Sequence, residues 1–358
     1  IFYNYKPLQV MWEIEAQELY GIERKILVDI RSPSEYAEFH IPGAINLPLF
    51  EDDEKKIIGL VYRKEGVERA TELGYSIAKR KLSRIFDKFR ELKKSYDHVI
   101  VYCWRGGKRS EELCKVLSSA GIEVIRLKGG YRAYRQFILQ DMQNLLEGIN
   151  FLVLTGKTGV GKSKVLKLLK AQGLPAVDLE ELAQDRGSVF GKVGKKNCIS
   201  QKMFDALLYE SLRGLRSHYA FIEDESRWIG NIHLPDPLWK KKEEGIFIEI
   251  HNSMENRVKN ILEEYTREEG WEDEVRQALY RIRKYLGEKN LAQAIKMLEN
   301  KEYKTLVRFL METHYDKKYK VSKRPLYTLD GSDIHKCGEE LIKIFNTYVK
   351  ICPSSSPV

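Results

Sequence analysis

Short apolar runs rich in β-branched residues alternate along the chain with longer stretches of helical periodicity. In the first third, the strand-like runs are KILVDI from Lys25, AINLP from Ala44, HVIVYC from His98 and EVIRL from Glu123. Helical stretches separate most of them, and a turn-rich segment, RSPSEYAEFHIPG, separates the first two. This alternation predicts an α/β layered fold with a mostly parallel sheet.

A second series of strand-like runs begins at NFLVLTG and continues through PAVDLE, YAFIEDES, GIFIEI and PLYTLDG. It predicts a second α/β unit, joined to the first through a helical stretch around residues 137–148. We therefore expect two domains, one over residues 1–140 and the other over residues 141–350.

Between about residues 253 and 320 the periodicity becomes purely helical, which predicts a helical insertion before the last strand of the second domain. The residues that form its apolar stripes are Val258, Ile261, Leu262, Tyr265, Val275, Leu279, Ile282 and Leu286. Many Lys and Arg residues fill the polar faces, but Glu and Asp lie among them. A nucleic-acid surface and an ordinary solvated face both fit this pattern.

Composition narrows the class of protein. The 358 residues are 43% hydrophobic and 32% charged, as in a folded globular protein, and no apolar run is long enough to span a bilayer. Sixty-one Lys and Arg against 52 Asp and Glu give a net charge of +9, which favours a polyanionic partner. No signal peptide precedes the first strand, so we expect a cytoplasmic protein without membrane association.

The five cysteines are an odd number and are widely spaced. They are Cys103, Cys114, Cys198, Cys337 and Cys352, and no two form a CxxC pair. This spacing argues against a disulfide framework and against a zinc site, and it agrees with a reducing compartment.

The segment VIVYCWRGGKRSEEL places Cys103 where a strand ends and a glycine-rich turn leads into a helix. Two glycines let successive N–H groups point inward, and the helix N-terminus adds partial positive charge. The pattern predicts a nucleophilic thiolate in an anion cradle, and we expect Cys114, on the following helix, to lie in the core. The cradle residues are Trp104, Arg105, Gly106, Gly107, Lys108, Arg109 and Ser110.

The segment GKTGVGKS between an apolar strand and a helix matches the phosphate-binding loop G-x-x-x-x-G-K-S. Its backbone N–H groups are expected to wrap a diphosphate, with Lys162 on the outer oxygens and the Ser163 hydroxyl on Mg²⁺. The residues of this loop are Gly156, Lys157, Thr158, Gly159, Val160, Gly161, Lys162 and Ser163. No NKxD guanine motif follows, so the diphosphate need not belong to a nucleotide.

Acidic residues at two further strand ends are candidates to complete this site. Asp224, in YAFIEDES, is predicted to take a metal-ligand or general-base role, although ordinary strand-end carboxylates fit the segment equally well. PAVDLEEL ends another strand with Asp178 and Glu180, and the loop after it offers Arg186 and Ser188 for an anion contact.

Two segments resemble the rhodanese fold. VDIRSPSEYAEFHIPGAINLP, from Val28 to Pro48, is similar to its N-terminal signature, and YCWRGGKRS is similar to its active-site loop. The resemblance implies that Cys103 carries a persulfide or its selenium counterpart. Arg109 follows six residues after Cys103, one more than in common sulfurtransferases. The wider loop suits phosphate or selenophosphate, and its spacing is also that of the tyrosine-phosphatase loop.

A rhodanese-like unit followed by a P-loop unit resembles the tRNA 2-selenouridine synthase family. The blocks that carry this resemblance lie in one order, and they are CWRGGKRS, GKTGVGKS, DLEELAQDRGSVFG, SQKMFDALL, IEDESRWIG and HYDKKY. It implies a selenotransferase acting on the wobble 2-thiouridine of tRNA, with selenophosphate and geranyl diphosphate as co-substrates and an S-geranylated intermediate. Trp104 is the aromatic residue best placed to stack on a base of the anticodon loop.

Two other functions fit parts of the sequence. A cysteine-dependent phosphatase, or a P-loop kinase or hydrolase, fits the two loops taken separately. A tRNA-binding or regulatory protein with degenerate loops fits less well, because Cys103, Lys162 and Ser163 are all present.

Overall fold

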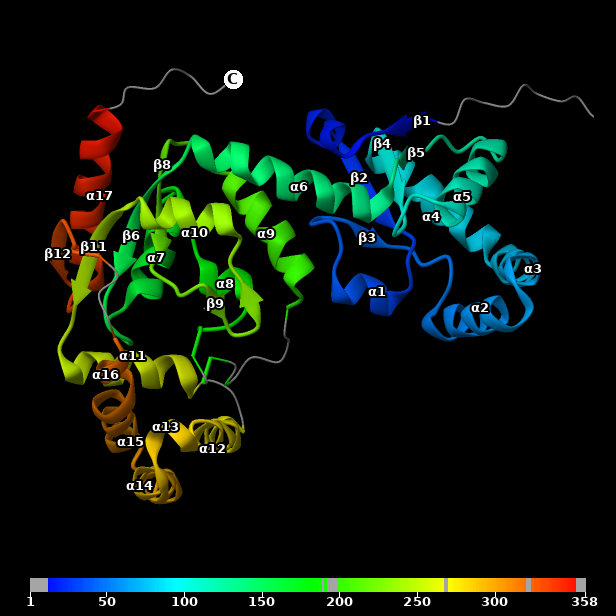
Figure 1. Cartoon of the computed structure of the whole chain (residues 1–358). Coiled ribbons are helices and arrows are strands. Elements are labelled where there is room, and N and C mark those ends of the chain that lie inside the picture. The colour runs from blue at the N-terminus through cyan, green and yellow to red at the C-terminus, as the bar shows by residue number, and fades with distance from the viewer. Residues whose placement is uncertain are drawn as a thin grey trace, which may run out of the picture. The chain divides into compact units, whose positions relative to one another are not determined.

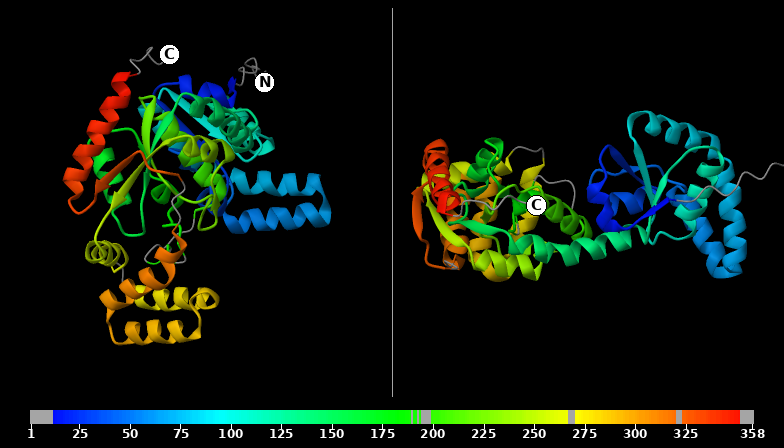
Figure 2. Two further views of the ribbon diagram at one scale, coloured as in Figure 1. Left: turned by 60° about the vertical axis from the view of Figure 1, so that its left-hand side comes forward. Right: turned by 90° about the horizontal axis from the view of Figure 1, so that it is seen from above.

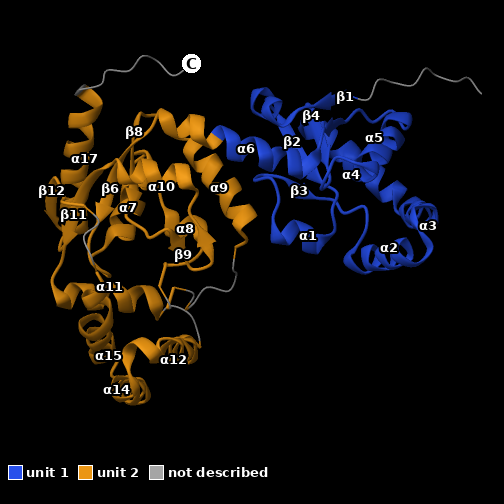
Figure 3. Ribbon diagram, in the orientation of Figure 1, with its two compact units in different colours: residues 1–141 blue, residues 142–358 orange. Residues whose placement is uncertain are grey.

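The computed structural model describes residues 12–188, 190, 191, 193, 199–266, 270–319 and 323–351. The chain divides into two compact units, residues 1–141 and residues 142–358 (Figure 3). The division falls inside helix α6 (Gly130–Glu147), the long helix shared by both units. Cys198 and Cys352 lie outside the described residues, whereas Cys103, Cys114 and Cys337 are free thiols.

Unit 1 is built on a five-stranded, all-parallel sheet with the order β1-β5-β4-β2-β3 (Figure 1). Its strands are β1 (Trp12–Ile14), β2 (Lys25–Asp29), β3 (Ile45–Asn46), β4 (His98–Tyr102) and β5 (Ile125–Leu127). Its other elements before α6 are the 3₁₀ helix η1 (Ala16–Gly21), α1 (Pro33–Glu38), α2 (Asp52–Glu65), α3 (Val67–Lys79), α4 (Leu82–Ser95) and α5 (Lys108–Ser119).

The core of unit 1 lies between the sheet and helices α4 and α5. The central strand β4 is apolar on both faces, since a parallel sheet covered by helices buries both sides of each strand. Phe89 from α4 and Leu117 from α5 are fully buried in this core. By contrast, α2 contributes no buried residue, and it lies side by side with α3 (Figure 2).

Unit 2 repeats the plan with the strand order β12-β11-β6-β8-β7, again all parallel. These strands are β6 (Asn150–Thr155), β7 (Ala176–Val177), β8 (Tyr219–Glu223), β11 (Ile246–His251) and β12 (Tyr327–Asp330). A small antiparallel pair consists of β9 (Trp228–Ile229) and β10 (Ile232–His233). The helices that cover the sheet are α7 (Lys162–Ala171), α8 (Leu179–Ala183), α9 (Gln201–Arg213), α10 (Asp236–Glu243) and α17 (Ile334–Ile351).

The helical insertion lies between β11 and β12, as the sequence predicts. It consists of α11 (Met254–Tyr265), α12 (Trp271–Arg281), α13 (Arg283–Leu286), α14 (Glu288–Glu299), α15 (Tyr303–Leu310), the π-helical turn η2 (Met311–Tyr315) and α16 (Asp316–Lys318). Its apolar stripes form a separate core that includes Leu279, Leu291 and Leu306, and Trp271 packs against Tyr303 at its edge. Trp271 and Tyr303 therefore serve packing, whereas Tyr280 and Tyr285 of the insertion are exposed. The expected α/β fold class is confirmed in both units.

In the described part of the chain, no helix is both long and apolar enough to cross a membrane.

Candidate active sites

The cysteine loop of unit 1 follows β4, the central strand of the sheet. Cys103 comes directly after this strand, and helix α5 begins five residues later at Lys108. The first turn of α6 supports the loop, because the Tyr131 N–H donates to the Cys103 carbonyl over 2.9 Å. A Cβ on Gly130 would lie 2.2 Å from the Cys103 carbonyl oxygen, so this contact requires glycine.

The backbone of this loop is arranged to bind an anion. Among the described residues, the N–H groups of residues 105–109 donate to no other protein group. Unpaired N–H groups at the start of a helix are ready donors for phosphate-like oxygens, and the helix dipole adds to their attraction. The expected cradle is therefore present as a backbone feature.

The thiol itself is less open than the sequence suggests. Cys103 is 3% exposed and belongs to the apolar core beside Leu113 and Cys114. Its Sγ lies 3.3 Å from the Ser110 Oγ, and the Ser110 hydroxyl also donates to the Gly107 carbonyl. Attack by Cys103 on a bound substrate would therefore require the loop to expose the sulfur, and its catalytic role stays a prediction.

The cations of the loop differ in their surroundings. Arg105 and Lys108 are exposed, whereas Arg109 is half-buried and lies 3.4 Å from Glu35. Burial alone would raise the pKa of Glu35, but Arg109 and Lys55 lower it. Arg109 therefore keeps a partner inside the protein, and an incoming anion competes with Glu35 for it.

Asp29 and Arg31, both in the segment from Val28 to Pro48 that resembles the rhodanese signature, form a fully buried ion pair. The Arg31 Nη2 donates to the Asp29 carboxylate over 2.6 Å and to the Phe39 carbonyl over 2.5 Å. The guanidinium also lies over the Phe39 and Tyr131 rings. Trp104 stacks on Tyr131, with 5.7 Å between the ring centroids. The Asp29–Arg31 pair thus supports the Tyr131 ring, on which Trp104 stacks.

The phosphate-binding loop of unit 2 follows β6, which is again the central strand. Gly156 has a φ of +143°, and a Cβ there would lie 2.5 Å from the Ile250 carbonyl oxygen. Of the described residues Lys157–Ser163, only Val160 donates its backbone N–H to a protein carbonyl. The remaining N–H groups are available to wrap a diphosphate, as the motif predicts.

Two side chains of this loop form hydrogen bonds to neighbouring protein groups. The Lys162 ammonium donates to the Gly156 carbonyl over 2.9 Å, and the Ser163 hydroxyl donates to Glu180 over 3.0 Å. Glu180 therefore occupies the position beside the Ser163 hydroxyl for which the sequence favoured Asp224. Burial raises the pKa of Glu180, while Lys162 lowers it.

A group of buried carboxylates lies behind Glu180. Glu223 is fully buried and accepts the Glu180 N–H over 3.3 Å, while its other oxygen has no partner among the described residues. Burial, together with the charges of Glu180 and Asp178, raises the pKa of Glu223 well above its usual range. A raised pKa is the expected response of a carboxyl group that lies near other carboxylates where water cannot screen them.

Asp224 has structural partners of its own, and its predicted metal-ligand or general-base role stays a prediction. Its two oxygens accept from the Lys242 ammonium over 2.7 Å and from the Thr155 hydroxyl over 3.0 Å. Lys242 is 1% exposed, so Asp224 provides its buried counter-charge. The sequence could not show this, because Lys242 comes from helix α10, eighteen residues further along the chain.

Arg186 and Ser188 also differ from expectation. Arg186 donates to the carbonyls of Val193 and Glu264 and stacks over the Tyr265 ring. Ser188 accepts the Phe190 N–H through its hydroxyl oxygen. Both residues therefore hold their own loop against the insertion instead of offering an open anion contact.

Sequence reasoning missed a link between the insertion and the phosphate-binding loop. Asp316, in the HYDKKY block, accepts from Arg257 over 2.6 Å and lies 3.4 Å from the Lys157 ammonium. Arg257 is 4% exposed and also donates to the Thr158 carbonyl. The position of this block at the end of the insertion was the only signal in the sequence.

A small apolar pocket of about 70 Å³ adjoins the same loop. Thr158 lies at the loop side, Ser188 and Phe190 come from the loop after α8, and residues of the insertion, such as Leu262 and Tyr315, form the rest of the wall. The phosphate-binding loop thus has an apolar neighbour built mainly from a part of the chain more than a hundred residues away.

In the described residues, no group of three or more His, Cys, Asp or Glu side chains is arranged to hold a metal ion. A Mg²⁺ ion commonly takes one or two protein oxygens and completes its shell with phosphates and water. The pair of Ser163 and Glu180 fits such a site.

Fold and loops together define a two-domain protein with a rhodanese-like domain followed by a P-loop domain. A rhodanese-like domain model matches residues 14–137, and the model described as the tRNA 2-selenouridine synthase AAA domain matches residues 149–327. The chain belongs to the tRNA 2-selenouridine synthase family.

Three relatives named tRNA 2-selenouridine synthase illustrate the similarity. The protein from Sulfurovum sp. (strain NBC37-1) is 30% identical over 82% of this chain and 87% of its own length. The protein from Hahella chejuensis is 32% identical over 82% of this chain and 84% of its own length. The protein from Nitrosomonas europaea is 34% identical over 71% of this chain and 67% of its own length.

Proposed function

We propose that this chain is a tRNA-modifying enzyme that replaces the sulfur of wobble 2-thiouridine with selenium. The observation that carries the proposal is the presence of two anion-binding loops, each after the central strand of its own parallel sheet, in a chain of this family. In such sheets, substrates bind outside the carboxyl ends of the strands.

The first step uses the phosphate-binding loop and geranyl diphosphate. The sulfur of 2-thiouridine forms a bond to C1 of the geranyl group, while the C1–O bond breaks and diphosphate leaves with the electron pair. The base loses its N3 proton in this step, and the departing diphosphate takes it up. The open N–H groups of residues 157–163 and the Lys162 ammonium stabilise the negative charge that develops on the leaving diphosphate. The apolar pocket beside Thr158 suits the hydrocarbon part of this donor better than it suits a nucleotide sugar.

A Mg²⁺ ion would be held by the Ser163 hydroxyl and the Glu180 carboxylate, together with diphosphate oxygens. The ion would supply further neutralisation of the leaving group's charge.

The second step uses the cysteine loop and selenophosphate. A bond forms between selenium and C2 of the base, while the C2–S bond breaks and geranylthiol leaves with a proton. Water then cleaves the selenium–phosphorus bond and phosphate departs. The N–H groups of residues 105–109 and the cations Lys108 and Arg109 hold the phosphate part of the donor. Cys103 acts in this step on the departing geranylthiol.

The tRNA is the polyanionic partner that the net charge of +9 favours. Trp104 is half-buried and supported on one side by Tyr131, so it can stack on an unpaired base of the anticodon loop.

The test is a reaction of the purified chain with tRNA that contains 2-thiouridine, geranyl diphosphate and selenophosphate, followed by mass spectrometry of the nucleosides. The expected product is 2-selenouridine, with the S-geranyl nucleoside accumulating when selenophosphate is withheld. Unchanged 2-thiouridine would sink the proposal. Phosphate release from ATP or an aryl phosphate without tRNA would favour a hydrolase instead.

A further inference from the structure

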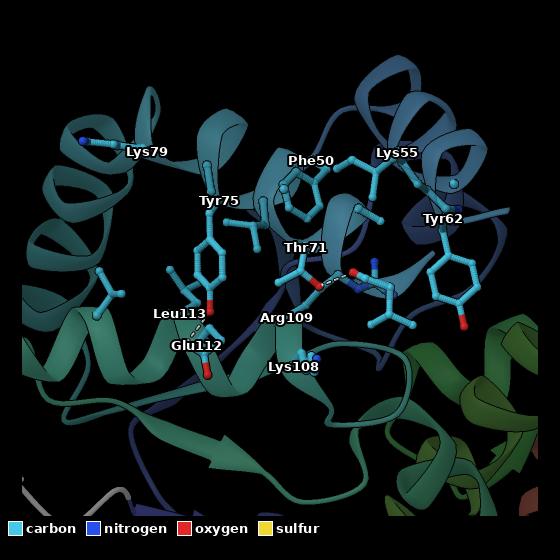
Figure 4. A pocket seen from close by; sticks show the side chains of 18 of the residues that line it. Phe50, Lys55, Tyr62, Thr71, Tyr75, Lys79, Lys108, Arg109, Glu112 and Leu113 are labelled. Atoms are coloured by element: carbon cyan, nitrogen blue, oxygen red, sulfur yellow. Dashed lines mark hydrogen bonds between the residues drawn. The ribbon is translucent and has the colours of Figure 1, made fainter. Parts of the chain in front are cut away.

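Unit 1 contains a large cavity that the proposed chemistry does not yet use. It has a volume of about 700 Å³ and lies among α2, α3 and α5 (Figure 4). Its wall is mainly apolar and includes Phe50, Ile58, Tyr62, Leu82 and Leu113. Voids left by imperfect packing are rarely larger than a water molecule, whereas ligand cavities commonly measure about 300–1,000 Å³.

The cavity is continuous with the cysteine loop. Lys108 and Arg109 belong both to the loop's cradle and to the cavity wall. Lys55 and Lys79 add two more cations, and the one carboxylate among the wall residues, Glu112, accepts from the Tyr75 hydroxyl. The wall residues therefore carry more positive than negative charge, part of which Glu35 balances at Lys55 and Arg109, while the surface of the wall is apolar.

The two helices on one side of the cavity leave unusual amounts of apolar surface uncovered. Helix α2 has no buried residue, and α3 has only Ala70 and Gly74. Tyr62 and Tyr75 both line the cavity and are 56% and 51% exposed. A pair of helices that faces a hollow in this way lacks a partner for its apolar face.

We infer that this cavity binds the geranyl group of the S-geranylated tRNA intermediate during the second step. The occupant must combine a hydrocarbon chain with a polyanion, because the wall is apolar and its cations outnumber its carboxylates. A hydrocarbon chain attached to an anticodon loop has both features. Its reacting end must also lie at the cysteine loop, where Lys108 and Arg109 connect the cavity to the anion cradle. This inference rests on the proposed function.

The cavity then selects the S-alkylated base before selenium is transferred. A long alkyl group would be held next to the loop that binds selenophosphate, whereas an S-methyl group would leave the hollow unfilled. The selenation step should therefore favour S-geranyl over S-methyl nucleosides.

Gly59 offers a way to fill the cavity without disturbing the fold. It lines the hollow from the middle of α2, and a Cβ there would meet nothing within 4 Å. Gly59→Trp should occupy the space meant for the alkyl chain, and Gly59→Ala should leave that space open. Leu60→Trp is the matched control, because Leu60 is the next residue of the same helix, is 47% exposed and is not part of the cavity wall.

The experiment gives the full-length protein selenophosphate and synthetic anticodon stem-loop RNAs with S-geranyl- or S-methyl-2-thiouridine. The wild type should prefer the S-geranyl RNA, and Gly59→Trp should lower kcat/KM for that RNA by about tenfold or more while sparing the S-methyl RNA. Gly59→Ala and Leu60→Trp should keep the wild-type ratio. Circular dichroism confirms that each variant is folded.

The outcomes separate the inference from the proposed function. If the wild type selenates neither RNA, the proposed function fails. If it selenates both RNAs equally well, or if Gly59→Trp keeps the wild-type preference, the cavity does not bind the alkyl group although the function stands. If Gly59→Trp instead abolishes a dimer seen by analytical ultracentrifugation and leaves the preference intact, the cavity belongs to an interface between copies of this chain, and the inference is overturned.

Discussion

The cysteine loop and the phosphate-binding loop occupy the same topological position in their two units. Each follows the central strand of a five-stranded parallel sheet, and each leads directly into a helix, α5 or α7. In both loops most backbone N–H groups lack a protein acceptor among the described residues. Anion binding is thus a shared property of strand, turn and helix N-terminus, whatever side chains the loop carries.

The loops differ in what their reactive side chains do. Lys162 already lies across its loop, bonded to the Gly156 carbonyl. The Cys103 sulfur instead turns into the core and contacts Ser110. The charged side chain of the phosphate-binding loop is therefore preformed, whereas the thiol of the cysteine loop is covered.

The strongest test of this contrast is Cys103→Ser. We expect selenation to fall about 10⁴-fold, as when a catalytic nucleophile is removed, while geranylation by unit 2 continues. The S-geranyl nucleoside should therefore accumulate, which mass spectrometry detects. Cys114→Ala is the control, because burial raises the pKa of Cys114 to about 12 and keeps it a thiol in the core. Equal loss in both variants would mean that Cys103 is only a core residue.

The second prediction tests whether Asp224 stabilises the fold of unit 2, in contrast to Glu180, which lies beside Ser163 at the phosphate-binding loop. Asp224→Asn removes the nearer of the two carboxylates paired with buried Lys242, the other being Glu243, and should lower the free energy of unfolding by up to about 3–5 kcal/mol. Asp236→Asn breaks the exposed pair with Arg227 and should cost at most about 1 kcal/mol. Urea denaturation measures both changes. If the Asp224→Asn protein is as stable as the wild type but has lost geranylation activity, Asp224 has the predicted catalytic role.

The third prediction concerns the preformed loop. Lys162→Ala should reduce geranylation by about 10²–10³-fold, because one donor to the developing charge is lost. Selenation of a synthetic S-geranyl RNA should remain near the wild-type rate, since that step uses the other loop. Lys167→Ala, which removes an exposed lysine of the same helix α7, should change neither rate. If Lys162→Ala stops both geranylation and selenation, the two loops do not serve separate steps.

The smallest effect is expected from pH. Burial raises the pKa of Glu223, so the folded protein keeps a proton that the unfolded chain releases above its ordinary value of 4.5. Stability should therefore fall as pH rises above about 4.5, by at most about 1.4 kcal/mol per pH unit for this one group. Glu223→Gln removes this contribution, so its stability relative to the wild type should rise between about pH 5 and pH 7. A constant difference across that range would contradict the buried, protonated state.

Local motifs were predicted well because their geometry depends on neighbours in sequence. The strand, turn and helix around Cys103 and around Lys162 lie where the apolar runs and glycines place them. The helical insertion also follows from its periodicity. The strand β1 and the pair β9 and β10 are too short for a pattern of apolar residues to reveal them.

The roles of individual polar residues could not be predicted as well. The sequence placed Asp224 among the site carboxylates. In the structure Asp224 accepts from Lys242 of α10, and Glu180 is the carboxylate beside Ser163. Arg186 lay in a loop suited to anions, but its guanidinium bonds carbonyls of its own loop and of α11. Each outcome depends on a partner distant in the sequence.

The sequence by itself determined the two α/β units, their order and the positions of both anion-binding loops, because apolar periodicity and glycine spacing act over a few residues. The tertiary structure alone decided how deeply the Cys103 sulfur lies and which carboxylate meets Ser163. It also decided where the apolar hollow opens beside Lys108 and Arg109. Burial and charge pairing are properties of segments brought together by folding, and the linear order of residues does not specify those contacts.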